Sequence, residues 1–137
     1  MLKTCFIKHD FNLPDHSNEL LMATEIIQKI KNKLKQIKKI KNINDKTYEQ
    51  LYEETIRILD YIGNLSMSVF KVEEEIERMY TMQFQHSPQL GKKLCNDHYT
   101  NIHHPYSLLK NRCFKLLDDL DDEYIKCNKR KPPNWNI

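Results

Sequence analysis

The chain has little glycine, with only Gly63 and Gly91 among 137 residues. Loops that cradle phosphates or dinucleotides need several closely spaced glycines, so the sequence excludes a glycine-rich cofactor loop. It also lacks the glycine-flanked serine of a nucleophile elbow, and no pair of carboxylates implies a catalytic pocket. We therefore predict that the protein is not an enzyme and has no cofactor and no small-molecule substrate.

Long hydrophobic runs are absent as well. No stretch approaches the roughly 18 uninterrupted apolar residues of a membrane-spanning helix. The chain does not open with a basic region followed by an apolar run, as a secretory signal would. We predict no membrane association. The cysteines, Cys5, Cys95, Cys113 and Cys127, have no pairing rhythm, which is typical of free thiols in a reducing compartment.

What the chain does contain is charge, and its distribution is uneven. The net charge is only +3, while 30% of the residues are charged. Residues 18–43 hold seven basic and two acidic residues, residues 44–85 hold four and nine, and residues 86–137 hold nine and six. Two basic regions thus flank an acidic middle. A modest net charge does not exclude a phosphate-binding face, because the field is set locally.

The clearest periodicity begins at Ser17 or Asn18, either of which could cap a helix, and ends near Lys41. Apolar residues recur there at alternating steps of three and four: Leu20, Ala23, Ile27, Ile30, Leu34 and Ile37. This seven-residue repeat predicts a long amphipathic helix whose other faces are rich in lysine. Three interpretations stay open: a core helix with a solvated face, a phosphate-contacting helix, or one strand of a coiled coil with a partner.

Two more helices are predicted in the N-terminal part. Thr47 and Gln50 form a possible capping box for the first, and Gly63 gives it a stop signal. Its apolar face is predicted to comprise Tyr48, Leu51, Tyr52, Thr55, Ile58, Leu59 and Ile62. The second, residues 65–84, has an acidic outer face that would repel phosphates. Residues 1–84 are therefore predicted to be an arm followed by a helical hairpin or bundle.

The remaining residues suggest three shorter helices. Ser87 and the following proline start the first. Pro105 should interrupt it, because proline lacks an N–H donor, and Ser107 can cap the next helix. The acidic residues 118–122 offer a tight turn, and a short basic helix is expected over residues 122–130. Helix, turn, helix, tight turn and basic helix is the layout of a helix-turn-helix DNA reader.

A resemblance to a known family supports that layout. It rests on Leu94, Tyr99, Ile102, His104-Pro105-Tyr106 and Leu116. These residues resemble the end of helix 1, the loop and the helix-2 leucine of homeodomains with a three-residue loop extension. The resemblance covers the last third of the chain and lacks the Trp-Phe-x-Asn-x-Arg signature of the family's third helix. With this resemblance and a composition rich in Lys, Asn and Ile, the chain is similar to the mating-type regulators of social amoebae.

We accordingly expect an all-α protein in which residues 85–137 form a homeodomain-like trihelical (helix-turn-helix) unit with a basic C-terminal tail. The leading hypothesis is a DNA-binding regulator of transcription that binds duplex DNA. Asn128 is predicted to read bases, because an amide can pair bidentately with adenine. The other predicted DNA contacts are Lys110, Arg112, Lys126, Lys129, Arg130 and Lys131. The resemblance implies a nuclear location and control of mating type. A solvated end or a nuclear import signal is the competing interpretation of the basic tail.

The alternative hypothesis is a protein-interaction adaptor. It would bind a homologous or helical partner through residues 18–84, without nucleic acid. A homeodomain-like fold, in contrast, should place Tyr99, Leu116 and Ile125 in one small core.

No metal site is predicted. Cys95 and His98 have a ligand-compatible spacing, but no second pair completes a zinc site. The acidic residues 118–123 lack the spacing and the glycine of a calcium loop, so we interpret them as capping residues.

Overall fold

The computed structural model describes residues 15–136, except for the side chains of residues 71–73, 76, 98–99, 101–102, 134 and 136. Within this range the chain forms three long helices and a short 3-10 helix, with no strand: α2 (Ser17–Ile40), α3 (Asp45–Gln83), α4 (Pro88–Asn128) and η1 (Pro133–Asn136). The all-α prediction is confirmed. Of the arm predicted over residues 1–16, residues 1–14 lie outside the described residues.

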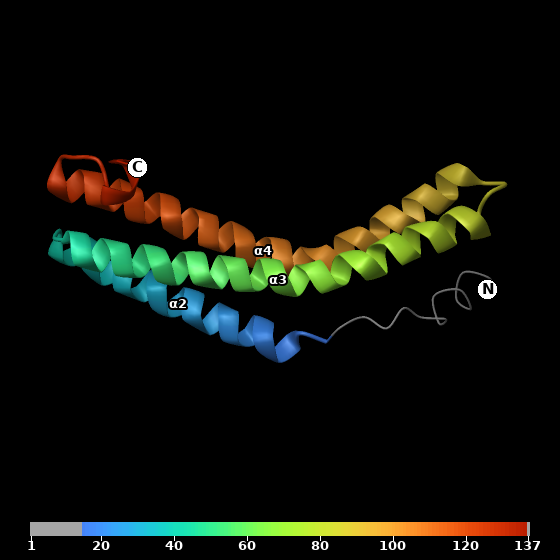
Figure 1. Ribbon diagram of the computed structural model, residues 1–137, viewed down its shortest axis with the longest axis horizontal. Helices are drawn as coiled ribbons and strands as arrows, with labels where there is room; N and C mark the ends of the chain where they lie inside the picture. Colours follow the sequence, from blue (N-terminus) through green and yellow to red (C-terminus); the bar gives the residue numbers. More distant parts are fainter. Residues whose placement is uncertain (1–14, 137) are drawn as a thin grey trace.

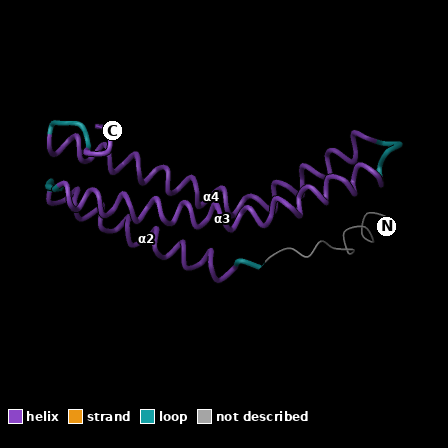
Figure 2. The backbone as a smooth tube through the Cα atoms, viewed as in Figure 1, coloured by secondary structure: helices purple, strands orange, loops and turns teal. Residues whose placement is uncertain are grey.

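The helices lie side by side as an up-and-down arrangement (Figure 1). The helices α3 and α4 form an antiparallel hairpin and share the most extensive interface. The shorter α2 runs antiparallel to α3 and covers one half of this hairpin. The other half extends past the start of α2 as a two-helix arm (Figure 2). The molecule is thus a three-helix bundle at one end and a helical hairpin at the other.

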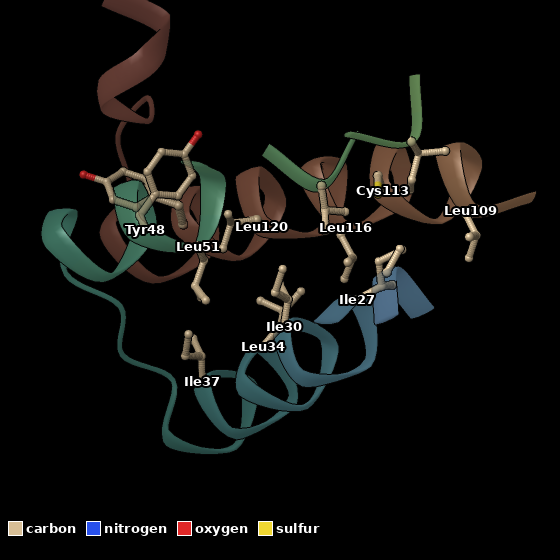
Figure 3. Packing of buried hydrophobic residues seen from close by; sticks show 14 of the residues in the cluster. Ile27, Ile30, Leu34, Ile37, Tyr48, Leu51, Leu109, Cys113, Leu116 and Leu120 are labelled. Atoms are coloured by element: carbon tan, nitrogen blue, oxygen red, sulfur yellow. The ribbon is translucent and has the colours of Figure 1, made fainter. Parts of the chain in front are cut away.

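The core of the bundle contains the apolar repeat of α2. Ala23, Ile27, Ile30, Leu34 and Ile37 are all buried. Figure 3 shows several of them directed toward residues of the other two helices. From α3 and α4 the same cluster includes Tyr48, Leu51, Leu109, Cys113, Leu116 and Leu120. The interpretation of this repeat as a core stripe is confirmed, and its use as a coiled-coil seam for a partner is wrong, because the chain's own helices occupy it.

The predicted helix stop at Gly63 is wrong, because α3 continues through it without a break. Buried residues Ile58, Ile62, Ser66 and Val69 keep a spacing of three and four across the glycine. The packing face therefore stays in phase. A glycine inside a helix costs about 1 kcal/mol, which is less than the roughly 1.5–3 kcal/mol gained by burying one large aliphatic side chain.

The predicted interruption of α4 at Pro105 is also wrong. The proline side chain is exposed, while Tyr106 and Leu109 directly after it are buried. The lost backbone hydrogen bond thus falls on the solvent side and the buried face stays intact. Figure 1 shows that α4 bends near its middle and that α3 bends with it. A proline inside a helix is a common cause of such a bend.

The predicted tight turn at residues 118–122 and the separate last helix are wrong for a similar reason. Leu116, Leu120 and Tyr124 are buried at four-residue steps, so one face of α4 stays in the core across the acidic run. Residues 88–128 form one helix where three were predicted.

Of the three residues expected to form the small core of a homeodomain-like unit, Leu116 and Ile125 have described side chains. The side chain of Tyr99 lies outside the described side chains. Leu116 belongs to the core shared by the three long helices, and Ile125 is half-buried.

The helix starts differ from the predicted caps by a few residues. Asn44 caps α3, where its side-chain oxygen accepts a hydrogen bond from the Thr47 amide at 2.7 Å. Asp15 lies two residues before α2 begins, and its carboxylate accepts a hydrogen bond from the Ser17 amide at 3.0 Å. The predicted start of α4 directly after Ser87 is confirmed.

The two glycines give a matched test of helix packing. A Cβ atom added to Gly91 would lie 3.0 Å from the Phe84 Cβ and 3.1 Å from the Tyr80 carbonyl oxygen, whereas one added to Gly63 would meet nothing within 4 Å. We expect Gly91→Ala to lower the free energy of unfolding by about 1–3 kcal/mol through overpacking. We expect Gly63→Ala to raise it by about 0.5–1 kcal/mol through helix propensity. Urea unfolding measures both. A Gly91→Ala protein as stable as the wild type would contradict the close approach of α3 and α4.

Candidate functional surfaces

At one end of the bundle, here called the closed end, the α2–α3 loop meets the end of α4. A group of polar side chains that we call the end network holds this end together: Asp45, Tyr48, Asp121, Tyr124 and Arg130. The Tyr124 hydroxyl donates to the Asp45 carboxylate, and the Tyr48 hydroxyl donates to Asp121. Arg130 donates to Asp45 at 2.8 Å and to the Tyr124 hydroxyl at 3.0 Å. The Tyr48 and Tyr124 rings lie 4.9 Å apart. The network ties the start of α3 to the end of α4.

Asn128, the predicted base reader, lies beside this network. Its amide donates to the Ile43 carbonyl at 2.9 Å and to the Tyr124 carbonyl at 3.2 Å. It thereby fastens the α2–α3 loop to α4. Asn128 and Arg130 were both predicted to contact DNA, and both make hydrogen bonds within the fold.

The other predicted DNA contacts are dispersed. The Lys110 ammonium donates to the Ser66 hydroxyl on α3 at 3.2 Å. Arg112, two residues or about 200° further around α4, lines a groove beside α2. The exposed lysines at the end of α4 are Lys126, Lys129 and Lys131. Since Lys110 lies about 27 Å along the helix from Asn128, the structure does not gather the seven residues on one surface.

Two grooves mark the sides of α3 and α4 that face α2. One, of about 370 Å³, runs between α2 and α4 and is lined by Thr24, Ile27, Gln28, Lys31, Arg112, Lys115, Leu116 and Asp119. The other, of about 400 Å³, runs between α2 and α3 and is lined by Met22, Ile26, Glu54, Arg57, Ile58 and Tyr61. The first groove carries three cationic side chains and one carboxylate, so the α2 side of α4 is basic.

The opposite side of the hairpin carries a second apolar stripe. Two positions along a helix correspond to a rotation of about 200°, so a residue midway between two groove-lining residues that are four positions apart faces away from α2. On α3 these are Ile56 and Leu59, and on α4 they are Phe114 and Leu117. We define the outer stripe as these four residues plus Tyr52, which lies on the same side of α3, and Phe70, five full turns beyond Tyr52.

The outer stripe is only partly covered by the chain itself. Phe70 is 45% exposed and Phe114 is 52% exposed. Tyr52, Ile56, Leu59 and Leu117 are half-buried. Gly63 lies between Leu59 and Phe70, where an added Cβ would meet open space. The stripe is therefore a partly exposed apolar surface, which Gly63 and the Lys110–Ser66 hydrogen bond interrupt between Leu59 and Phe70.

Sequence reasoning missed the outer stripe, although its signal was present. Tyr52 and Leu59 were assigned to a single apolar face together with the core residues Leu51 and Ile58. Such a wide apolar face can contain two seams, each with its own spacing of three and four. Only the position of α2 shows which seam the chain itself covers.

The structure offers little for metal or thiol chemistry. No group of three or more potential ligands gathers among the described residues, and the His98 side chain is outside them. Cys95 and Cys113 are both buried. Burial raises the pKa of the Cys113 thiol to about 11, so this thiol is poorly nucleophilic at neutral pH. No helix in the described part of the chain is long and apolar enough to span a membrane.

Comparisons with protein-family models, curated proteins and solved structures find no match for this chain.

The end network predicts a specific pH dependence. Hydrogen bonds from Tyr124 and Arg130 hold the pKa of Asp45 below its usual value. A lowered pKa in the folded state stabilises the protein above the unfolded pKa, near 3.9, and this contribution is lost as the pH falls through the folded value. Asp45→Asn should therefore be less stable than the wild type at pH 7, and the difference should shrink below about pH 4. Urea titrations at several pH values measure this.

The control for this prediction is Asp60→Asn, which removes an exposed carboxylate of α3 outside the network. It should change stability little at either pH. A stability difference for Asp45→Asn that stays constant between pH 7 and pH 3 would contradict a stabilising role of the Asp45 charge.

Proposed function

We propose that this protein is a helical interaction module that binds an α-helix of a partner protein along the outer stripe. The observation that carries the proposal is the run of apolar side chains on the side of α3 and α4 that α2 leaves open. Contiguous exposed apolar surface on a soluble domain marks interaction sites. The exposure of the aromatic rings of Phe70 and Phe114 fits this role, because such rings often anchor interfaces.

The dimensions of the stripe suit a helix. It extends along α3 from Tyr52 to Phe70, a rise of 18 helical steps or about 27 Å. A partner helix of about five turns would cover it. The chain already uses this mode of packing, since α2 lies along α3 and α4 on the opposite side. A helix on the outer stripe would complete a four-helix arrangement and bury the half-exposed side chains.

A nuclear DNA-binding regulator, as the resemblance to homeodomains implies, is the second candidate. It is favoured by the exposed lysines Lys126, Lys129 and Lys131 at the closed end of the bundle. We prefer the interaction module because Asn128 and Arg130 are engaged within the fold. A homeodomain-like unit would also require α4 to break at two places where it is continuous.

The proposed function predicts binding of a model helix. The probe is a fluorescent 18-residue peptide with leucines at heptad positions and glutamine on its other faces, measured by anisotropy. We expect saturable binding to the wild type. The double variant Ile56→Gln, Phe114→Gln should bind at least about tenfold more weakly, because it loses two apolar contacts.

The matched control is Leu21→Gln. Leu21 is 60% exposed on α2 and lies outside the outer stripe, so this variant should bind like the wild type. Circular dichroism checks that each variant stays helical. Equal binding by the double variant and the wild type would contradict the use of the outer stripe.

The DNA hypothesis makes a separate prediction. Binding to a labelled AT-rich duplex should weaken steeply between about 50 and 200 mM salt, because the slope of log affinity against log salt concentration scales with the number of phosphate contacts. The double variant Lys129→Ala, Lys131→Ala should weaken it further and reduce the salt slope. The interaction module alone predicts no duplex binding at either salt concentration.

A further inference from the structure

The edges of the outer stripe carry acidic side chains. They are Glu49, Glu53 and Asp60 on α3 and Asp118 and Asp121 on α4. Each lies three or four residues from a member of the stripe, which makes them neighbours on the helix surface. All are exposed except Asp121, which is half-buried and accepts the Tyr48 hydrogen bond.

Few cations offset these carboxylates. Arg57, which lines the groove between α2 and α3, forms an ion pair with Glu53 at 3.7 Å. Lys110 lies on the stripe side of α4, and its ammonium donates to the Ser66 hydroxyl. Glu49, Asp60 and Asp118 have no ion pair within the described part of the chain. A partner that covers the stripe therefore meets apolar side chains bordered by negative charge.

The α2 side of the molecule has the opposite character. The groove between α2 and α4 holds Lys31, Arg112 and Lys115 with one carboxylate. The bundle is thus polarised, with a basic side at α2 and an acidic, partly apolar side at the outer stripe. Such a field steers a cationic partner toward the outer stripe and an anionic one away from it.

We infer that the partner is an amphipathic helix whose apolar seam is flanked by lysine or arginine. This inference rests on the proposed function, since it names the chemistry of the helix that the outer stripe binds. Charge pairs at the rim of an interface add modest affinity each but act together on the association rate and on specificity. A helix with acidic flanks would face like charges along the part of the outer stripe that runs from Tyr52 to Leu59.

A second copy of this chain fits the outer stripe less well. A two-fold symmetric pair would place the same surface of both copies in contact. Glu49, Asp60 and Asp118 of one copy would then lie close to those of the other. The apolar repeat of α2 does not offer an alternative seam to a second copy, because it is buried in the bundle.

The test uses three fluorescent 18-residue peptides with the same leucine seam and with lysine, glutamine or glutamate flanks. We expect the lysine peptide to bind the full-length protein about tenfold or more tightly than the glutamate peptide at 50 mM salt, with the glutamine peptide between them. At 500 mM salt the three affinities should converge, because screening weakens exposed charge pairs.

A charge-reversed protein sharpens the test. The triple variant Glu49→Lys, Asp60→Lys, Asp118→Lys should prefer the glutamate peptide. Its matched control is Glu25→Lys, Glu75→Lys, Asp97→Lys, which makes the same change in net charge at exposed positions away from the outer stripe. The control should keep the preference for lysine.

The outcomes separate the two proposals. Equal binding of all three peptides, or a preference for glutamate, would overturn the inference of a basic partner and leave the interaction module standing. Binding of none of them would overturn the proposed function itself. Sedimentation that shows a dimer of the wild type and a monomer of Ile56→Gln, Phe114→Gln would identify a second copy as the occupant and overturn the inference.

Discussion

The burial of the apolar repeat of α2 between α3 and α4 is the constraint on which the rest of the structure depends. Ile27, Ile30, Leu34 and Ile37 are each at most 9% exposed. Burying four such side chains contributes on the order of 10 kcal/mol, comparable with the whole net stability of a small domain. A helical hairpin without a third helix has a thin core. The position of α2 therefore decides which part of the hairpin is a bundle and which side of it remains open.

The fold could be predicted from the sequence where burial follows a strict repeat. The repeat of α2 has no competing local signal, and its core role follows directly from its spacing. At Gly63 and Pro105 a local helix-breaking signal competes with a buried face that stays in phase. Ile62 and Val69, on either side of Gly63, and Tyr106, directly after Pro105, are buried, which shows that packing prevailed.

The candidate site was less predictable, because it depends on contacts between residues far apart in the chain. Asn128 and Arg130 are chemically suited to DNA, and their residue types gave no sign of another use. Their partners Ile43 and Asp45 lie 85 residues earlier in the chain. Likewise, the sequence shows that α3 has a wide apolar face, but only the fold divides it into a covered seam and an open one.

The end network and the outer stripe are linked through the register of the hairpin. Tyr48 meets Tyr124 near one end of the interface, Ser66 meets Lys110 further along, and Phe70 meets His103 beyond them. Two long helices with similar apolar seams could otherwise pair one turn out of step. The polar contacts penalise such a slip, because it would leave the hydroxyls of the buried residues Tyr48, Ser66 and Tyr124 without partners. By fixing this register, these contacts, to which Lys110 contributes, bring the outer-stripe residues of α3 and α4 to the same side of the hairpin.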